Sequence, residues 1–120
     1  MPRETFDTKI TQVQSEIYIL GSMVEQAVLD ATNTLRTRDL EEAQRIFEED
    51  ALINEKRFAL ENAIIILLGT QQPFARDLRL LAAMLIVVNE LERMADYAKG
   101  IAKINIKIGK SSCFIFAIEH

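Results

Sequence analysis

FDTKITQVQSEIYILGSMVEQAVLDATNTL, residues 6–35, decides the fold class, because its apolar side chains recur at intervals that alternate between four and three. The positions are Phe6, Ile10, Val13, Ile17, Leu20, Val24, Ala27, Ala31 and Leu35. This spacing is the heptad seam of a long helix in a bundle or coiled coil. Gly21 costs roughly 1 kcal/mol relative to alanine, which the surrounding pattern can absorb. We predict one long structural helix without chemistry of its own.

A second helix is predicted to begin after Asp39 and to run to about Leu68. Asp39 and Glu42 have the spacing of an N-cap and its partner in a capping box. Gly69 is expected to end the helix in the left-handed conformation that glycine adopts readily. The seam of this helix contains two charged residues at positions that should be apolar: Ala43, Ile46, Asp50, Ile53, Arg57, Leu60, Ile64 and Leu67.

A third helix should follow Pro73, which suits a first helical turn because its missing N–H is not needed there. The apolar face of this helix comprises Leu81, Met84, Leu85, Val88, Leu91, Ala95, Ala98 and Ala102, and the pattern fades near Gly109. We expect an all-α, antiparallel three-helix bundle over residues 1–109. Residues 110–120 form an atypical C-terminal tail. Its apolar run 114–118 is either a strand-like arm on a neighbouring molecule or the product of a truncated or frame-shifted reading frame.

Composition excludes several classes of protein. A chain of 120 residues has room for one domain, its formal charge is −4, and it has no basic stripe suited to nucleic acid. No apolar run, that of residues 63–68 included, approaches the roughly 20 residues of a membrane span. The first residues lack the apolar region of a secretory signal, and the lone Cys113 permits no disulfide within one chain. We therefore expect a cytoplasmic protein.

Two carboxylates on the third helix are candidate metal ligands. Glu92 and Asp96 lie four residues apart on one helical face, at the edge of the apolar sector. If the second and third helices are antiparallel, Asp50 and Asn54 reach the same depth within roughly one turn. Facing carboxylates and an amide oxygen suit a hard cation. We expect iron, manganese, magnesium or calcium on oxygen ligands rather than zinc on thiolates.

The same acids have simpler interpretations. They could belong to a solvated face or form ordinary salt bridges with Arg57 or Arg93, and the chain would then be a helical scaffold or interaction module without metal. An enzyme is not expected. Gly69-Thr70 lacks the lysine of a phosphate-binding loop, and the only histidine, His120, is terminal and activates no nucleophile. A carboxylate-bridged metal hydrolase is the third alternative.

Three segments together resemble the PhoU family. Residues 71–79, QQPFARDLR, are similar to the family signature Q-Q-P-x-A-x-D-L-R. Residues 92–96, ERMAD, resemble its metal motif E-R-I-G-D, with Ala95 in place of the glycine, and residues 50–54, DALIN, resemble its segment D-x-x-I-N/D. The resemblance covers approximately residues 3–109.

This resemblance implies one three-helix half of a six-helix protein, because a second repeat is absent. It implies a phosphate-responsive protein that negatively regulates phosphate uptake and signalling, between components of the phosphate transporter and a sensor histidine kinase. Association with the membrane would be peripheral, through these partners only. The resemblance also implies metal, often iron, on an acidic face, with Glu92 and Asp96 as principal ligands and Asp50 and Asn54 as contributors.

Apolar residues outside the three seams predict self-association. They are Ile19, Met23, Ile65, Ile66, Ile86 and Val87. In a three-helix domain these residues would leave exposed apolar patches, which usually mark an interface. Because two identical halves would recreate a six-helix arrangement, we expect a homodimer or a higher even oligomer.

Overall fold

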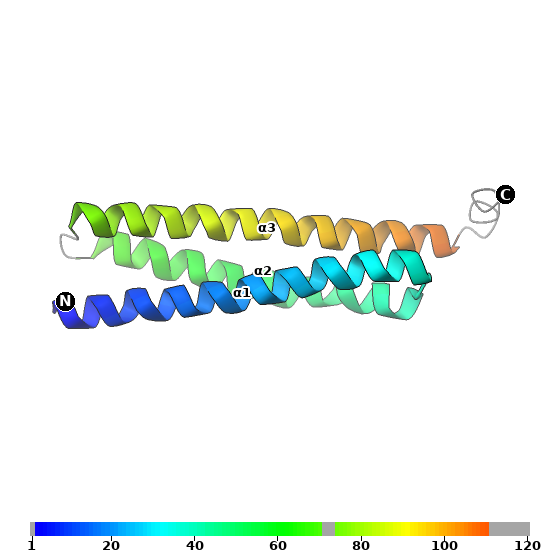
Figure 1. Cartoon of the computed structure of the whole chain (residues 1–120), viewed down its shortest axis with the longest axis horizontal. Coiled ribbons are helices and arrows are strands. Elements are labelled where there is room, and N and C mark those ends of the chain that lie inside the picture. Colours follow the sequence, from blue (N-terminus) through cyan, green and yellow to red (C-terminus); the bar gives the residue numbers. More distant parts are fainter. Residues whose placement is uncertain (1, 71–73, 111–120) are drawn as a thin grey trace.

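The computed structural model describes residues 2–70 and 74–110, which form three long helices: α1 (Arg3–Thr37), α2 (Leu40–Gly69) and α3 (Ala75–Lys110). Each helix packs against the other two, and α2 runs antiparallel to α1 and α3 (Figure 1). No strand occurs in these two ranges. The predicted all-α, antiparallel three-helix bundle is therefore confirmed. The expectations for Pro73 and for the run 114–118 concern residues outside the described ranges.

A two-residue turn joins α1 to α2. Arg38 has a left-handed backbone, with φ of 61°, and its N–H donates to the carbonyl of Thr34. The side chain of Asp39 then accepts a hydrogen bond from the backbone N–H of Glu42 at 3.1 Å. This bond satisfies one of the free N–H groups at the helix start, so the predicted N-cap is confirmed.

The end of α2 differs from the prediction for Gly69. Gly69 is the last helical residue, and no glycine in the described ranges has a positive φ. The capping residue is Thr70, in an extended conformation, whose N–H and Oγ1 both donate to the Leu67 carbonyl, at 3.4 and 3.0 Å. Because these bonds satisfy a terminal carbonyl, α2 ends without a left-handed residue.

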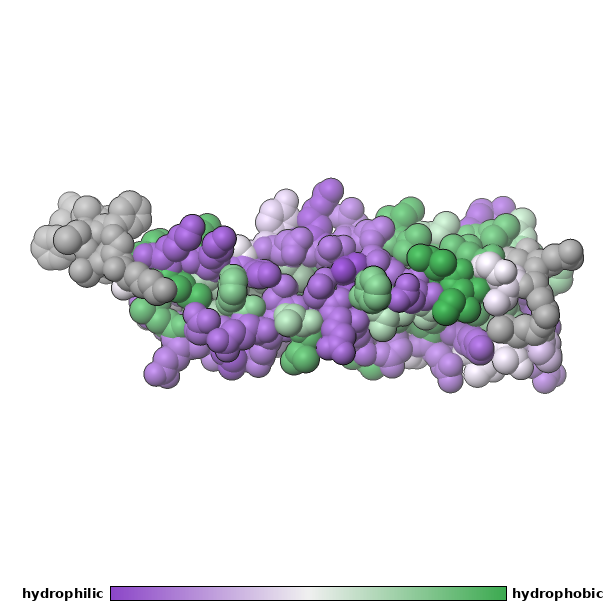
Figure 2. Space-filling model, turned by 180° about the vertical axis from the view of Figure 1, so that it is seen from behind, coloured by the Kyte–Doolittle hydropathy of each residue, from purple (hydrophilic) through white to green (hydrophobic). Residues whose placement is uncertain are grey.

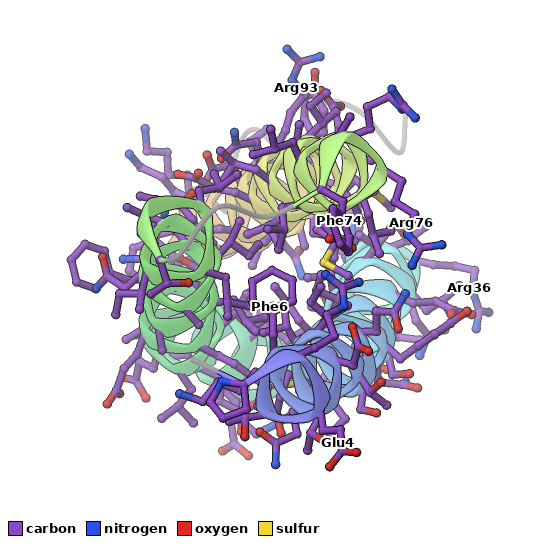
Figure 3. The ribbon with its side chains drawn as sticks, turned by 90° about the vertical axis from the view of Figure 1, so that its left-hand side faces the viewer. Glu4, Phe6, Arg36, Phe74, Arg76 and Arg93 are labelled. Atoms are coloured by element: carbon purple, nitrogen blue, oxygen red, sulfur yellow. The ribbon has the colours of Figure 1, made fainter. Side chains whose placement is uncertain are left out.

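The buried residues form two clusters along the bundle. The aliphatic core, toward the start of α3, contains mainly large side chains: Phe6, Ile10, Val13, Leu20, Val24, Ile53, Leu60, Ile64, Leu67, Leu81, Met84, Val88 and Ala95. The alanine core, toward the α1–α2 turn, contains Ala31, Ala43, Ile46, Ala98 and Ala102. Seen end on, Phe6 points into the space between the three helices (Figure 3). Most predicted seam positions are thus confirmed as the interior of the bundle.

The last turn of α1 departs from the predicted seam. Leu35 is 37% exposed, whereas Thr34 is buried, at 1%. The interval before Ala31 is four residues, so a strict alternation continues with three and leads to Thr34, and the structure keeps that heptad. The hydroxyl of Thr34 donates to the carbonyl of Ala31 at 2.8 Å, which satisfies it inside the bundle.

The surface has polar and apolar zones. The face seen in Figure 2 is largely polar along the middle of the bundle and apolar toward the start of α3. The apolar residues predicted to lie outside the seams are exposed, with the exception of Met23, which packs half-buried against the aliphatic core: Ile19, Ile65, Ile66, Ile86 and Val87. As far as the chain is described, none of its helices combines the length and apolar character that crossing a bilayer requires.

Candidate functional site

The four residues predicted to bind metal lie on two neighbouring helices, Asp50 and Asn54 on α2 and Glu92 and Asp96 on α3. Two ion pairs connect these helices along what we call the α2–α3 interface. Asp50 Oδ2 lies 3.5 Å from Lys99 Nζ, and Arg57 Nε lies 3.5 Å from Glu92 Oε2. Acidic and basic groups therefore alternate along the α2–α3 interface.

Arg57 lies at the centre of a group of polar side chains at the α2–α3 interface. Its side chain is only 14% exposed, because it occupies a seam position of α2. It donates to Asn54 Oδ1 at 3.1 and 2.7 Å, and it pairs with Glu61 at 2.8 Å as well as with Glu92. A guanidinium has five N–H donors, so one arginine can serve all three acceptors. The predicted alternative of a salt bridge with Arg57 is confirmed.

Asp50 is the second charge in the seam of α2, and Lys99 neutralises it. The Asp50 side chain is 13% exposed, and the Lys99 ammonium also lies 5.2 Å from the centre of the Phe47 ring. Sequence analysis did not single out Lys99. The available signal was its position seven residues after Glu92, which places both side chains on the same edge of α3. The other predicted salt-bridge partner, Arg93, instead approaches Glu90 at 3.8 Å on the exposed surface.

The prediction that Asp50 and Asn54 face Glu92 and Asp96 within roughly one turn is only partly right. Asp50 pairs with Lys99, which is two helical turns beyond Glu92 but less than one turn beyond Asp96. Arg57, the partner of Glu92, follows Asn54 by three residues, so Asn54 lies within about one turn of the level of Glu92. Periodicity within each helix cannot reveal such an axial offset between helices, because it reports only which side of a helix is buried.

Asp96 lies between the two ion-paired groups and is exposed. No ion pair involves it within residues 2–70 and 74–110. In the same part of the chain, no group of three or more His, Cys, Asp or Glu side chains is placed to hold a metal ion. Glu92 and Asp96 offer the oxygen donors that hard cations prefer, but Arg57 contacts Glu92 and the pair alone is an incomplete coordination set. Metal binding stays a prediction.

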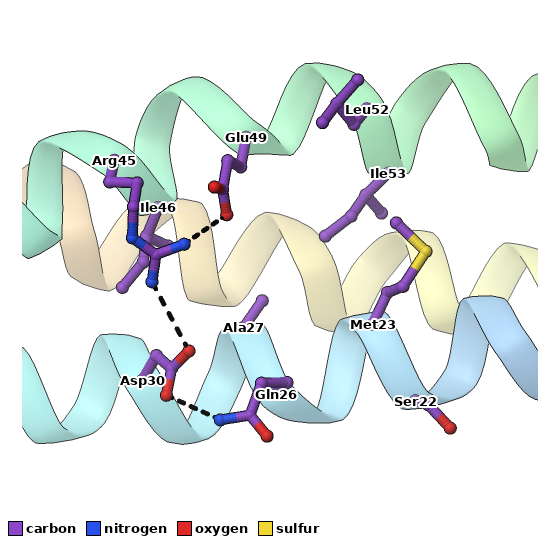
Figure 4. A pocket seen from close by; sticks show the side chains of 10 residues that line it. All are labelled: Ser22, Met23, Gln26, Ala27, Asp30, Arg45, Ile46, Glu49, Leu52 and Ile53. Atoms are coloured by element: carbon purple, nitrogen blue, oxygen red, sulfur yellow. Dashed lines mark hydrogen bonds and ion pairs between the residues drawn. The ribbon is translucent and has the colours of Figure 1, made fainter.

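A groove lies between α1 and α2, and Figure 4 shows the side chains that line it. Arg45 extends across it from α2, pairing with Glu49 on its own helix at 2.6 Å and with Asp30 on α1 at 3.8 Å. Asp30 also accepts a hydrogen bond from Gln26 at 2.7 Å. These polar groups contact one another across an otherwise apolar groove, so their role is to connect the two helices.

Asp77, from the segment QQPFARDLR, connects the starts of α1 and α3. It is 5% exposed and accepts hydrogen bonds from Arg3 at 2.5 and 2.9 Å and from the Phe74 N–H at 3.0 Å. The bond from Arg3 is the main cause that holds the pKa of Asp77 below its ordinary value, against the opposing effect of burial. The Arg3 guanidinium also lies 4.9 Å from the centre of the Phe74 ring. This aspartate therefore has a structural role.

Asn105 is a second polar residue inside the bundle that sequence analysis missed. It is fully buried, its Nδ2 donates to the Thr34 carbonyl at 2.9 Å, and its Oδ1 has no hydrogen-bond partner among the described residues. The available signal was its spacing, since it follows Ala98 and Ala102 at intervals of four and three. A polar residue at such a seam position restricts how the helices can align.

Comparison with known proteins gives one consistent family. The family model of the PhoU domain matches residues 17–104. The chain is 32% identical over 98 residues to the phosphate-specific transport system accessory protein PhoU of Edwardsiella tarda, which covers 82% of this chain and 40% of that protein. It is 35% identical over 104 residues to the PhoU homolog of Clostridium acetobutylicum, covering 86% of this chain and 48% of the homolog. For the protein of Escherichia coli K12 the identity is 31% over 98 residues, covering 82% and 41%.

The chain thus spans less than half the length of these relatives. No solved structure gives a significant match. The matched range, residues 17–104, contains all four predicted ligands and both ion-paired groups of the α2–α3 interface.

Proposed function

Because this chain belongs to the PhoU family, we propose that it is a phosphate-responsive regulatory protein that negatively regulates phosphate uptake and signalling. The observation that carries the proposal is the match of the PhoU domain over residues 17–104, a range that includes the ion-paired residues of the α2–α3 interface. The relatives are named accessory proteins of a phosphate-specific transport system. The proposal assigns regulation to the chain and no catalysis.

The proposed partners follow from the same relationship. In the cytoplasm, the bundle would contact components of a phosphate transporter and a sensor histidine kinase, and it would reach the membrane only through them. It would also pair with a second three-helix bundle, contributed by another copy of the chain. The exposed apolar side chains of all three helices support such contacts, because contiguous exposed apolar patches usually mark interaction sites.

We further propose that Glu92 and Asp96 bind a hard cation such as iron, manganese, magnesium or calcium. Both lie on the accessible side of α3, one turn apart, and Asp50 and Asn54 on α2 are the further oxygen donors that the sequence predicts. Arg57 contacts Glu92 at 3.5 Å and would compete with the cation for that carboxylate. Metal binding would therefore release Arg57 toward Glu61 and Asn54, which already hold it at 2.8 and 2.7 Å.

Substitution of Arg57 tests this competition. Removing its charge in Arg57→Gln frees Glu92, so the affinity for Mn²⁺ measured by calorimetry should rise severalfold. Arg45→Gln is the matched control, because Arg45 also pairs with acids but lies in the α1–α2 groove. An unchanged or weaker affinity in Arg57→Gln would contradict a cation site at Glu92.

Transport measurements test the regulatory role. The chain would be expressed in a bacterium that lacks its own PhoU-family protein, and uptake of labelled phosphate would be followed in phosphate-rich medium. We expect uptake to fall when the chain is present and to fall less with the double variant Glu92→Gln, Asp96→Asn. Unchanged uptake in the presence of folded wild-type chain would contradict the proposed function.

A second candidate function is a helical interaction module without metal. The observation that favours it is that Arg57 pairs with Glu92 and Lys99 pairs with Asp50. These ion pairs give both acids a structural role that requires no metal. Under this alternative the double variant at Glu92 and Asp96 would reduce phosphate uptake as strongly as the wild-type chain does. The same transport experiment therefore separates the two functions.

A further inference from the structure

A second heptad stripe runs along α3, outside the core seam. Its members recur at intervals of four and three, and we call them the α3 stripe: Arg76, Leu80, Ala83, Val87, Glu90 and Met94. The core of the bundle does not use this stripe, because the buried positions of α3 in this range are Asp77, Leu81, Met84 and Val88. A heptad stripe that is not buried within its own bundle is suited to packing against another helix.

The α3 stripe forms one side of the groove between α1 and α3. Leu80, Ala83 and Val87 line this groove, which has a volume of about 570 Å³. Leu80 and Val87 are 37% and 45% exposed, and Tyr18 on the opposite side of the groove is 80% exposed. The α3 stripe and the groove beside it thus offer apolar surface to a helix that would lie along them.

The charges of the stripe are arranged symmetrically about its centre. Arg76 lies seven residues before Ala83, and Glu90 lies seven residues after it. If a second α3 helix lies antiparallel on the first with Ala83 at the two-fold axis, Arg76 of each copy meets Glu90 of the other. Leu80 of each copy then lies beside Val87 of the other. The stripe is therefore complementary to itself in charge, and its apolar positions face one another, as a two-fold interface requires.

Both charged residues are available for contacts between copies. Arg76 projects away from the bundle on the side of α1 and α3 (Figure 3). Among the described residues its guanidinium lies over the Phe74 ring, whose centre is 5.9 Å from the guanidinium carbon. Glu90 approaches Arg93 at 3.8 Å on the exposed surface, and this contact is weak at such distance and exposure.

We propose that two copies of this chain associate through the α3 stripe, with their α3 helices antiparallel and Ala83 at the two-fold axis. This rests on the proposed pairing of two bundles but not on metal binding or phosphate regulation. The apolar residues at the centre exclude water from the contact, and the two Arg76–Glu90 pairs at its ends fix direction and register.

Charge reversal tests the pairing, with sedimentation equilibrium of the full chain across a dilution series as the readout. Glu90→Arg places like charges at both ends of the contact and should raise the dimer dissociation constant about tenfold or more. Arg76→Glu should do the same, and the double variant Arg76→Glu, Glu90→Arg should restore the wild-type value. Glu55→Arg, an equal charge change on an exposed position of α2, is the control and should leave it unchanged.

A cysteine at the axis gives an independent readout. Ala83→Cys, made together with Cys113→Ser, should form an intermolecular disulfide under mild oxidation, because the axis brings each position next to its own copy. Glu55→Cys in the same background should stay uncrosslinked. A wild-type chain that stays monomeric at high micromolar concentration overturns the pairing as a whole. A dimer that is insensitive to charge reversal and fails to crosslink at position 83 overturns only the α3 stripe and leaves the regulatory proposal standing.

Discussion

The aliphatic core and the alanine core use the same heptad spacing but fill it differently. In the aliphatic core, large side chains such as Leu20, Ile64 and Leu81 are completely or almost completely buried. In the alanine core, the equivalent positions hold Ala31 and Ala102, which are fully buried with far fewer carbon atoms. Because each buried methylene contributes about 0.8 kcal/mol, most of the hydrophobic stabilisation should come from the aliphatic core.

The alanine core is filled by small side chains that leave no room for larger ones. Ala31, Ala43 and Ala102 are fully buried. At the same end of the bundle Gly109 of α3 lies against the side chain of Leu40 at the start of α2. Small residues at this end therefore supply little buried surface. The difference between the two regions predicts that truncation is costly in one and enlargement is costly in the other.

Truncation in the aliphatic core should have the largest effect. Ile64 is fully buried, so Ile64→Ala loses transfer free energy and leaves a cavity, and the free energy of unfolding should fall by about 2–5 kcal/mol. Its neighbour Ile65 is 55% exposed, and Ile65→Ala is the matched control with a much smaller expected change. Urea denaturation followed by circular dichroism measures both. Equal losses for the two variants would contradict the assignment of the core.

Enlargement in the alanine core should have the next largest effect. Ala102 is fully buried, so Ala102→Leu should cost about 1–3 kcal/mol through overpacking. Ala82→Leu adds the same atoms at an exposed position of the same helix and serves as the control. Urea denaturation measures the free energy of unfolding of both variants. A higher free energy of unfolding for Ala102→Leu would show that the alanine core has unfilled space, and it would contradict the difference in packing between the two cores.

Acid should weaken the aliphatic end through Asp77. Its pKa is lowered in the folded state, chiefly by the hydrogen bond from Arg3, so its contribution is present above the ordinary carboxylate pKa of 3.8 and is lost as pH falls through the folded value. The stability difference between wild type and Asp77→Asn should therefore be largest near neutral pH and shrink below about pH 4. Thermal unfolding across this range measures it. A difference that is independent of pH would show that the Asp77 charge contributes nothing.

Replacement of Asn105 should have the smallest effect. Asn105→Leu loses one hydrogen bond to the Thr34 carbonyl, but that carbonyl also accepts from the N–H groups of Arg38 and Asp39, and the unpartnered Oδ1 is removed. The free energy of unfolding should change by no more than about 1 kcal/mol. Asn105→Asp, of nearly identical shape, should destabilise the bundle more, because it buries a carboxylate without a cation. A greater loss for leucine than for aspartate would refute this view of the site.

The sequence predicted the features that depend on periodicity within one helix. The seams of all three helices, the N-cap at Asp39 and the salt-bridge alternative for Arg57 were visible as spacing or as a charge at an apolar position. The burial of Thr34 was not predicted, because the neighbouring Leu35 is apolar and was assigned to the seam in its place. The strict heptad spacing leads to Thr34. Gly69 was also misjudged, because a threonine hydroxyl can satisfy the carbonyl that a left-handed glycine would have served.

Features that depend on how the helices lie relative to one another could not be predicted from the sequence. The pairing of Asp50 with Lys99 depends on the axial offset between α2 and α3, which no pattern within either helix encodes. The ion pair between Arg3 and Asp77 joins residues that are 74 positions apart in the sequence, and only the packing of α1 against α3 brings them together. The family motif marked Asp77 as part of a signature without revealing that its role is structural.

The central proposal is that Glu92 and Asp96 on α3 bind a cation, while the two cores hold the fold independently of it. Metal content and urea midpoint of the double variant Glu92→Gln, Asp96→Asn test it most directly. Arg57 keeps Asn54 and Glu61 as partners in this variant, so the midpoint should stay close to that of wild type. The account predicts that wild-type protein equilibrated with iron or manganese at neutral pH retains the metal and that the folded variant does not. Metal-free wild-type protein, or a variant that retains the same metal content, would contradict it.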